Sequence, residues 1–132
     1  MHSHHYNLVF KLASVCVIGV YVDDMDKALE FYCNMLGFKV RHKYDDCLIH
    51  LENEGPSLIL ETTDKPANAK YPGMSQVALG IETKNVVETA RKLRELGADV
   101  IHETPEKFPV GVFMAVRDPA GNLIELLQFN EQ

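Results

Sequence analysis

The chain has 132 residues, of which 46% are hydrophobic and 24% charged, and its formal net charge is −6. These proportions are typical of one compact globular domain, and the absence of a basic stripe leads us to expect no nucleic-acid partner. No apolar run approaches the roughly 20 residues that a membrane-spanning helix needs, so we expect no membrane partner and a cytoplasmic location.

The first half of the chain predicts one strand, one helix and three further strands. Residues 17–22 alternate between two kinds of side chain, which indicates a strand with two different faces. Asp24 is a helix N-cap residue, apolar residues recur after it at helical spacing, and Gly37 ends the helix. Further strands are expected over residues 38–43, 47–51 and 57–62.

The second half repeats this order. Residues 76–81 alternate as residues 17–22 do, and a helix is expected over residues 85–96, with Gly97 at its end. The apolar side of this helix is predicted to consist of Val86, Val87, Ala90, Leu93 and Leu96. The series is completed by a strand at 99–102, an irregular flap at 103–111 and a hairpin at 112–126.

The repeat predicts an α+β fold made of two tandem βαβββ modules. Its period of about 60 residues is too long for a solenoid repeat, and a duplicated supersecondary unit explains it better. We expect a flexible leader at residues 1–11 and a single domain at 12–132. Within that domain the expected parts are module one at 12–63, a linker at 64–75 and module two at 76–130.

The alternation assigns the two faces of each module's first strand. One face is uniformly bulky and is expected to pack against the helices: Ile18, Val20, Val22, Val77, Leu79 and Ile81. The opposite face is smaller or more polar, which leaves room for a ligand: Val17, Gly19, Tyr21, Gln76, Ala78 and Gly80.

A carboxylate lies within the apolar returning strand of the hairpin. Alternation places Leu123, Glu125 and Leu127 on one face of this strand. A carboxylate that faces an apolar interior costs several kcal/mol unless a metal ion, a hydrogen-bond donor or a proton offsets it. Glu125 is therefore a candidate functional residue, and the alternative is a solvated position at an open rim with no role.

Three segments of the chain carry a family resemblance. They are VYVDDMDKALEFY at residues 20–32, LGF at 36–38 and DPAGNLIEL at 118–126. With the duplicated order, the chain from Val15 to Phe129 resembles the vicinal oxygen chelate superfamily, which includes glyoxalase I, extradiol dioxygenases and bleomycin-resistance proteins. The resemblance implies a cupped, half-barrel mixed sheet with the helices on its outer face.

The resemblance also implies a metal site. Metal-using members take four ligands from the first and last strands of the two modules, and these positions fall on Val17, Glu61, Gln76 and Glu125. Val17 departs from the pattern because its side chain has no lone pair to donate. The remaining oxygen-only set suits hard divalent ions, so the expected cofactor is a divalent metal ion, with Mn²⁺, Mg²⁺ and Ni²⁺ as candidates. The histidines at 42, 50 and 102 are expected to be surface or hydrogen-bonded residues.

Two functions follow from the resemblance. The first is a glyoxalase-like lyase or isomerase of a small oxygenated substrate, in which Glu61 and Glu125 divide metal binding and proton transfer next to a carbonyl. The second is a metal-free protein that binds and sequesters a small molecule such as a bleomycin-type antibiotic. Tyr21 and Arg117 are the expected ligand contacts. The resemblance further implies a homodimer whose cups combine modules of both chains.

Overall fold

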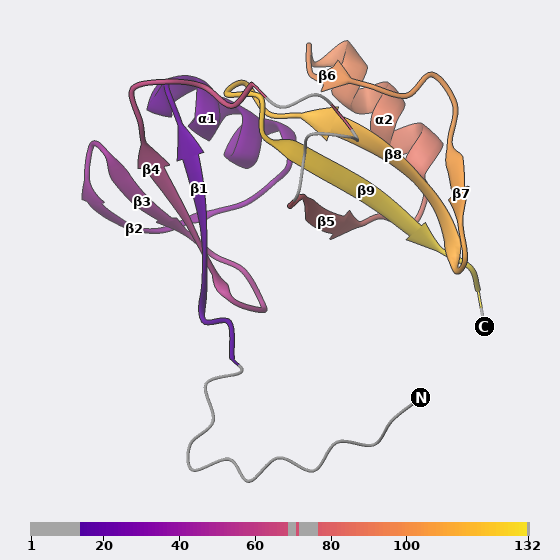
Figure 1. Cartoon of the computed structure of the whole chain (residues 1–132), viewed down its shortest axis with the longest axis horizontal. Helices are drawn as coiled ribbons and strands as arrows, with labels where there is room; N and C mark the ends of the chain where they lie inside the picture. Colours follow the sequence, from indigo (N-terminus) through magenta and orange to yellow (C-terminus); the bar gives the residue numbers. More distant parts are fainter. Residues whose placement is uncertain (1–13, 69–70, 72–76, 132) are drawn as a thin grey trace, which may run out of the picture.

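The computed structural model describes residues 14–68, 71 and 77–131. The predicted leader, residues 1–11, and Gln76 lie outside these residues. The described chain forms two modules, each with its own mixed sheet (Figure 1). This arrangement confirms the predicted α+β fold class with two tandem βαβββ modules.

The first module follows the predicted order. Its elements are β1 (Val17–Val22), α1 (Met25–Leu29), η1 (Glu30–Met35), β2 (Val40–Asp45), β3 (Leu48–Leu51) and β4 (Ser57–Thr62). The helix α1 continues directly into η1, which is a π-helical segment. The sheet has the order β1-β4-β3-β2, in which β1 and β4 run parallel and the other neighbours run antiparallel.

The second module repeats this topology. Its elements are β5 (Leu79–Glu82), α2 (Val86–Glu95), β6 (Asp99–Val100), β7 (Glu106–Phe108), β8 (Gly111–Arg117) and β9 (Leu123–Phe129). The sheet has the order β5-β9-β8-β6, with β5 parallel to β9, and β7 also pairs with β8. The stretch 103–111 is therefore not irregular throughout, because β7 lies in it.

The helix ends match the sequence signals. The side chain of Asp24 accepts a hydrogen bond from the backbone N–H of Lys27 at 3.1 Å, and Asn85 caps α2 in the same way, with Glu88 as donor at 3.0 Å. Each helical stretch is followed by a glycine with positive φ, +90° at Gly37 and +94° at Gly97.

The predicted apolar side of α2 is partly wrong. Val86, Ala90 and Leu93 are buried, whereas Val87 and Leu96 are 55% and 54% exposed. Val87 lies about 100° around the helix axis from Val86. Its side chain therefore points away from the helix side formed by Val86, Ala90 and Leu93, which packs on the sheet. No helix in the described part of the chain is long and apolar enough to cross a membrane.

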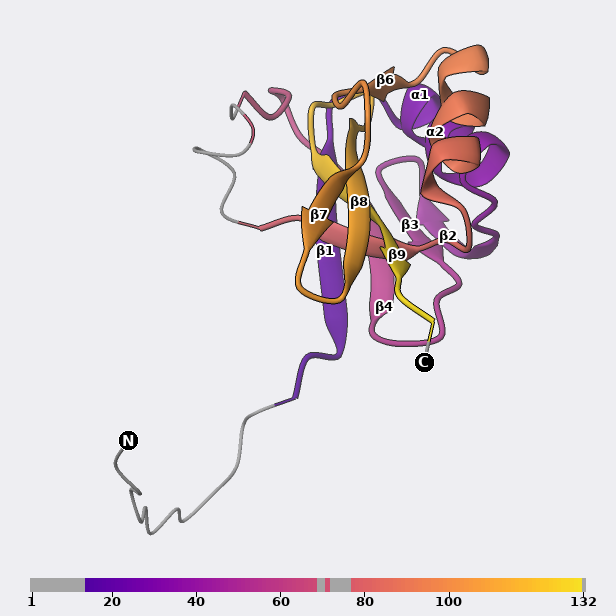
Figure 2. The same ribbon diagram turned by 90° about the vertical axis from the view of Figure 1, so that its right-hand side faces the viewer.

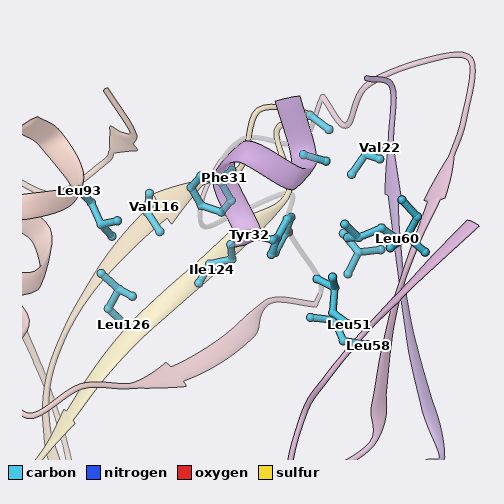
Figure 3. Close-up of a cluster of buried hydrophobic side chains, with 14 of the residues drawn as sticks. Val22, Phe31, Tyr32, Leu51, Leu58, Leu60, Leu93, Val116, Ile124 and Leu126 are labelled. Carbon is cyan, nitrogen blue, oxygen red and sulfur yellow. The ribbon is translucent and has the colours of Figure 1, made fainter. Parts of the chain in front are cut away.

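The two modules share one hydrophobic core. Figure 3 shows Leu58 and Leu60 of the first sheet on one side of Phe31 and Tyr32, with Ile124 of the second sheet on the other, and all five are buried. Figure 2 shows α1 and α2 on the same side of the molecule. Because side chains alternate along a strand, every second residue of each sheet points away from this core.

A buried carboxylate joins the modules. Asp118, only 4% exposed, accepts a hydrogen bond from the Tyr32 hydroxyl at 2.7 Å. It also accepts the backbone N–H groups of Ala120 and Asn122, at 2.9 and 2.8 Å, and the Asn122 side-chain amide. That amide donates in addition to the carbonyl oxygen of Tyr21 at 2.8 Å. The turn between β8 and β9 is thus attached to both α1/η1 and β1.

Removing the Tyr32 hydroxyl tests this connection. Tyr32→Phe keeps the ring, which is 0% exposed, but leaves Asp118 without one of its donors. We expect the free energy of unfolding, measured by urea titration, to fall by about 1–3 kcal/mol, as for other hydrogen bonds to charged groups. The exposed Tyr44 serves as a control, and Tyr44→Phe should change stability by less than about 0.5 kcal/mol. Equal effects of the two substitutions would contradict the connection.

Candidate functional site

The first open face is the side of the first sheet that points away from the shared core. Its residues alternate with the core residues: Val17, Gly19, Tyr21, Leu48, His50, Ile59 and Glu61. Val17 and Tyr21 are 51% and 54% exposed, whereas Val22 is fully buried, which confirms the faces predicted for β1. Glu61 follows Leu60, which points into the core (Figure 3). The side chain of Glu61 is half-buried and, by alternation, lies on the open face.

The strand register decides which residue lies beside Glu61. Glu61 is paired with Tyr21 on β1 and with Leu48 on β3. Val17 is paired with Ser57, four positions away, which corresponds to about 13 Å along the strand. Tyr21 rather than Val17 is therefore the immediate β1 neighbour of Glu61.

The second open face is the equivalent side of the second sheet. It consists of Gly80, Phe113, Ala115, Arg117, Leu123, Glu125 and Leu127. Glu125 is half-buried between its register partners Gly80 on β5 and Ala115 on β8, while its chain neighbours Ile124 and Leu126 are buried in the core. Because glycine and alanine have small side chains, neither strand neighbour covers the Glu125 carboxylate on the open face.

Tyr71 is the polar partner of Glu125 in the described part of the chain. Its hydroxyl donates a hydrogen bond to Oε2 of Glu125 at 2.9 Å. Desolvation, followed by this hydrogen bond and the charges of Glu125 and Glu106, raises the pKa of Tyr71 to about 12. The phenol is therefore a protonated donor at neutral pH, and it loses its proton as the pH rises through that value.

His102 stands beside Tyr71. Its Nδ1 accepts a hydrogen bond from the backbone N–H of Ala115 at 2.9 Å, which requires the proton of the neutral imidazole to be on Nε2. Nε2 lies 3.6 Å from a carboxylate oxygen of Glu106. The imidazole ring packs edge to face against Tyr71 and Phe113, with centroids 5.6 and 5.5 Å apart.

Sequence reasoning missed the grouping of Tyr71, His102 and Glu125. His102 was expected to be a surface or hydrogen-bonded residue, and the hydrogen bond from Ala115 agrees with the second description. The small side chain of Ala115 opposite Glu125 was a usable signal, because it leaves room for a ring above the sheet. Tyr71 lies in the predicted linker, where no hydrophobic periodicity indicates which way a side chain points.

The predicted ligand contacts lie on the two open faces. Tyr21 is beside Glu61, and Arg117 is on β8 two residues after Ala115, hence on the face of Glu125. The Arg117 side chain is 27% exposed, and its Nε lies 4.0 Å from Asp99, at the limit of an ion pair. Their role in binding a ligand stays a prediction.

The two candidate glutamates belong to different sheets. Glu61 lies on β4 of the first sheet, whereas Glu125 lies on β9 of the second. Gln76, the third predicted metal ligand, lies outside the described residues. Among the residues that the structure describes, no group of three His, Cys, Asp or Glu side chains could hold a metal ion.

The chemistry of the two carboxylates nevertheless fits a hard cation. Within the described ranges, no Lys, Arg or His lies within ion-pair distance of Glu61 or Glu125. Both keep oxygen lone pairs on an open face, and oxygen donors suit Mg²⁺ or Mn²⁺.

Comparison with known proteins places the chain in a family. The model of the glyoxalase/bleomycin resistance protein/dioxygenase superfamily matches residues 11–126. A probable lactoylglutathione lyase of Synechocystis sp. is 33% identical over 118 residues, which cover 81% of this chain and 88% of that protein.

Solved structures show the same fold. TnmS3, an antibiotic binding protein from Streptomyces sp. CB03234, superposes with a TM-score of 0.66 at 25% identity, covering 92% of this chain and 99% of that one. A glyoxalase/bleomycin resistance protein/dioxygenase from Alicyclobacillus acidocaldarius has a TM-score of 0.69 at 20% identity, covering 90% and 93%. The chain therefore belongs to the glyoxalase/bleomycin resistance protein/dioxygenase superfamily.

Proposed function

We propose that the protein is a divalent-metal-dependent lyase or isomerase that moves a proton next to a carbonyl group of a small oxygenated substrate. One observation carries the proposal. Glu61 and Glu125 occupy equivalent last-strand positions in the two modules, and each lies half-buried on an open face of its sheet. The name of the Synechocystis relative, a probable lactoylglutathione lyase, supports the same class of reaction.

The two carboxylates have different surroundings, and this bears on their roles. A bound divalent ion would supply Lewis-acid polarisation of the substrate carbonyl. Glu125, whose Oε2 is held by the Tyr71 hydroxyl, is suited to take a proton from the adjacent carbon with its other oxygen. Glu61 lies beside the half-exposed ring of Tyr21, which is placed to contact a substrate.

The site requires two chains in this proposal. A two-fold axis can set the first open face of one protomer against the second open face of its partner, which gives two equivalent sites. Each site would then contain Glu61 of one protomer and Glu125 of the other. The edge strands β1 and β5 and the exposed side chains of Val17 and Tyr21 provide surface for such a homodimer.

A second candidate is a metal-free binding protein that sequesters a small molecule such as an antibiotic. The likeness to TnmS3, an antibiotic binding protein, favours it, as does Val17 at a usual ligand position. The second module also has a run of edge-to-face aromatic contacts, from Phe113 to Phe108 and from Phe108 to Phe129, with centroids 6.0 and 5.9 Å apart. Such rings give a flat or aromatic ligand a surface to pack on.

Mixing two inactive variants tests the shared site. Glu61→Gln and Glu125→Gln should each lower turnover of hemithioacetals or related α-hydroxycarbonyl compounds at least 100-fold, since each removes a carboxylate without changing its size. When the two variants exchange subunits at equal concentration, half of the dimers are mixed and each mixed dimer has one intact site. We therefore expect recovery of about a quarter of the wild-type rate.

Two results would contradict this proposal. Full activity of Glu125→Gln would show that its carboxylate is not the base. An inactive mixture, or sedimentation of the wild type as a monomer at micromolar concentration, would show that the site is not shared between chains. The matched control is Glu54→Gln, an exposed carboxylate outside both open faces, which should keep the wild-type rate.

Calorimetric titration with metal ions separates the two candidate functions. The protein used is the full chain with His2, His4 and His5 changed to Ala, so that these histidines cannot bind metal themselves. We expect Mn²⁺ and Mg²⁺ to bind weakly, with Ni²⁺ as the third ion to test, and Glu61→Gln and Glu125→Gln to lower the affinity. Absence of binding by every divalent ion would favour the binding protein instead.

A further inference from the structure

We propose that Tyr71 is a positioning residue for Glu125, which it holds by one carboxylate oxygen so that the other is presented to the second open face. This inference rests on the proposed function, because it assigns the linker a part in the same site. The sequence places Tyr71 between the modules, 54 residues before Glu125, and no family position or periodic pattern points to it.

The first support is the hydrogen bond itself. Glu125 is anchored on β9 between Gly80 and Ala115, but these residues have no polar side chain to orient its carboxylate. The Tyr71 hydroxyl, 2.9 Å from Oε2, provides that orientation. A glutamate side chain has several rotatable bonds, so a fixed donor removes conformational freedom that a ligand would otherwise have to restrict.

The second support is that Tyr71 packs against His102, which is bound to Ala115, the strand neighbour of Glu125. The backbone N–H of Ala115 fixes His102 at 2.9 Å, and the planes of the His102 and Tyr71 rings meet at 88°. Ala115 is also the β8 register partner of Glu125. Each of these four residues therefore contacts the next one, from Ala115 through His102 and Tyr71 to Glu125, which is again paired with Ala115. These contacts restrict the movement of the Tyr71 ring.

The third support is the contrast with Glu61. Its β1 neighbour, Tyr21, is 54% exposed, whereas Tyr71 is half-buried against His102. The fixed donor is thus found at the carboxylate to which we assign both metal binding and proton transfer. Hydrogen bonds that orient a metal-binding carboxylate typically change metal affinity by about 10–100-fold when they are removed.

The test compares two Tyr→Phe substitutions in the full chain with His2, His4 and His5 changed to Ala. Tyr71→Phe removes only the oxygen that contacts Glu125, and we expect Mn²⁺ affinity, measured by calorimetry, to fall about tenfold. The melting temperature should stay within a degree or so of the parent protein, because the ring contact with His102 remains. Tyr44→Phe, on the exposed strand β2, is the matched control and should leave affinity unchanged.

A spectroscopic readout distinguishes positioning from a general structural effect. The chain contains five tyrosines and no tryptophan, so its near-ultraviolet absorbance difference on Mn²⁺ binding reports on tyrosine surroundings. We expect a difference signal in the parent protein and in Tyr44→Phe, and its loss in Tyr71→Phe. A persistent signal in Tyr71→Phe would count against Tyr71 as the residue that senses the carboxylate.

The inference and the proposed function can fail separately. If Glu125→Gln leaves Mn²⁺ affinity unchanged, Glu125 does not bind the ion and the proposed function fails, together with the role of Tyr71. If Glu125→Gln abolishes binding while Tyr71→Phe binds Mn²⁺ as the parent does, only the positioning role is overturned. A tenfold loss in Tyr71→Phe, with a complete loss in Glu125→Gln, supports both.

Discussion

The buried carboxylate of Asp118 determines how the two modules are joined. A charged group at 4% exposure is stable only because four donors surround it, among them the Tyr32 hydroxyl and the amides of the turn that follows. Burial and the neighbouring Asp118 charge raise the pKa of Tyr32, so the phenol stays a donor throughout the neutral range. The same turn starts β9, and its geometry therefore fixes the strand on which Glu125 lies.

This connection helps to set how the two sheets pack around the shared core. With the β8–β9 turn attached to Tyr32 and to the Tyr21 carbonyl, the apolar sides of both sheets meet around Phe31 and Tyr32 (Figure 3). Alternation then places Glu61 and Glu125 on the opposite, outer sides. The two carboxylates thus lie on the open faces of different sheets, and this placement is our reason for proposing a site shared between protomers.

The sequence predicted local features better than contacts between distant residues. The faces of β1, the helix cap Asp24 and the hairpin at 112–126 follow from rules that act over a few residues, and each is confirmed. The strand β7 was missed because Pro105 and Pro109 indicate a loop, whereas its pairing with β8 and the contact of Phe108 with Phe113 are tertiary. Tyr71 was missed for the same reason, since its partner Glu125 is 54 residues away.

The separation of core and open faces also bears on how one fold can serve several chemistries. Substitutions at Val17 or Tyr21 change half-exposed side chains that the shared core does not contain, so they alter binding with little cost to folding. Glu125 is different, because Tyr71, His102 and Ala115 are arranged around it. A set of contacts built around a carboxylate that the core does not need is best explained by a requirement of the site, and this favours chemistry or specific recognition at Glu125 over a solvated rim position.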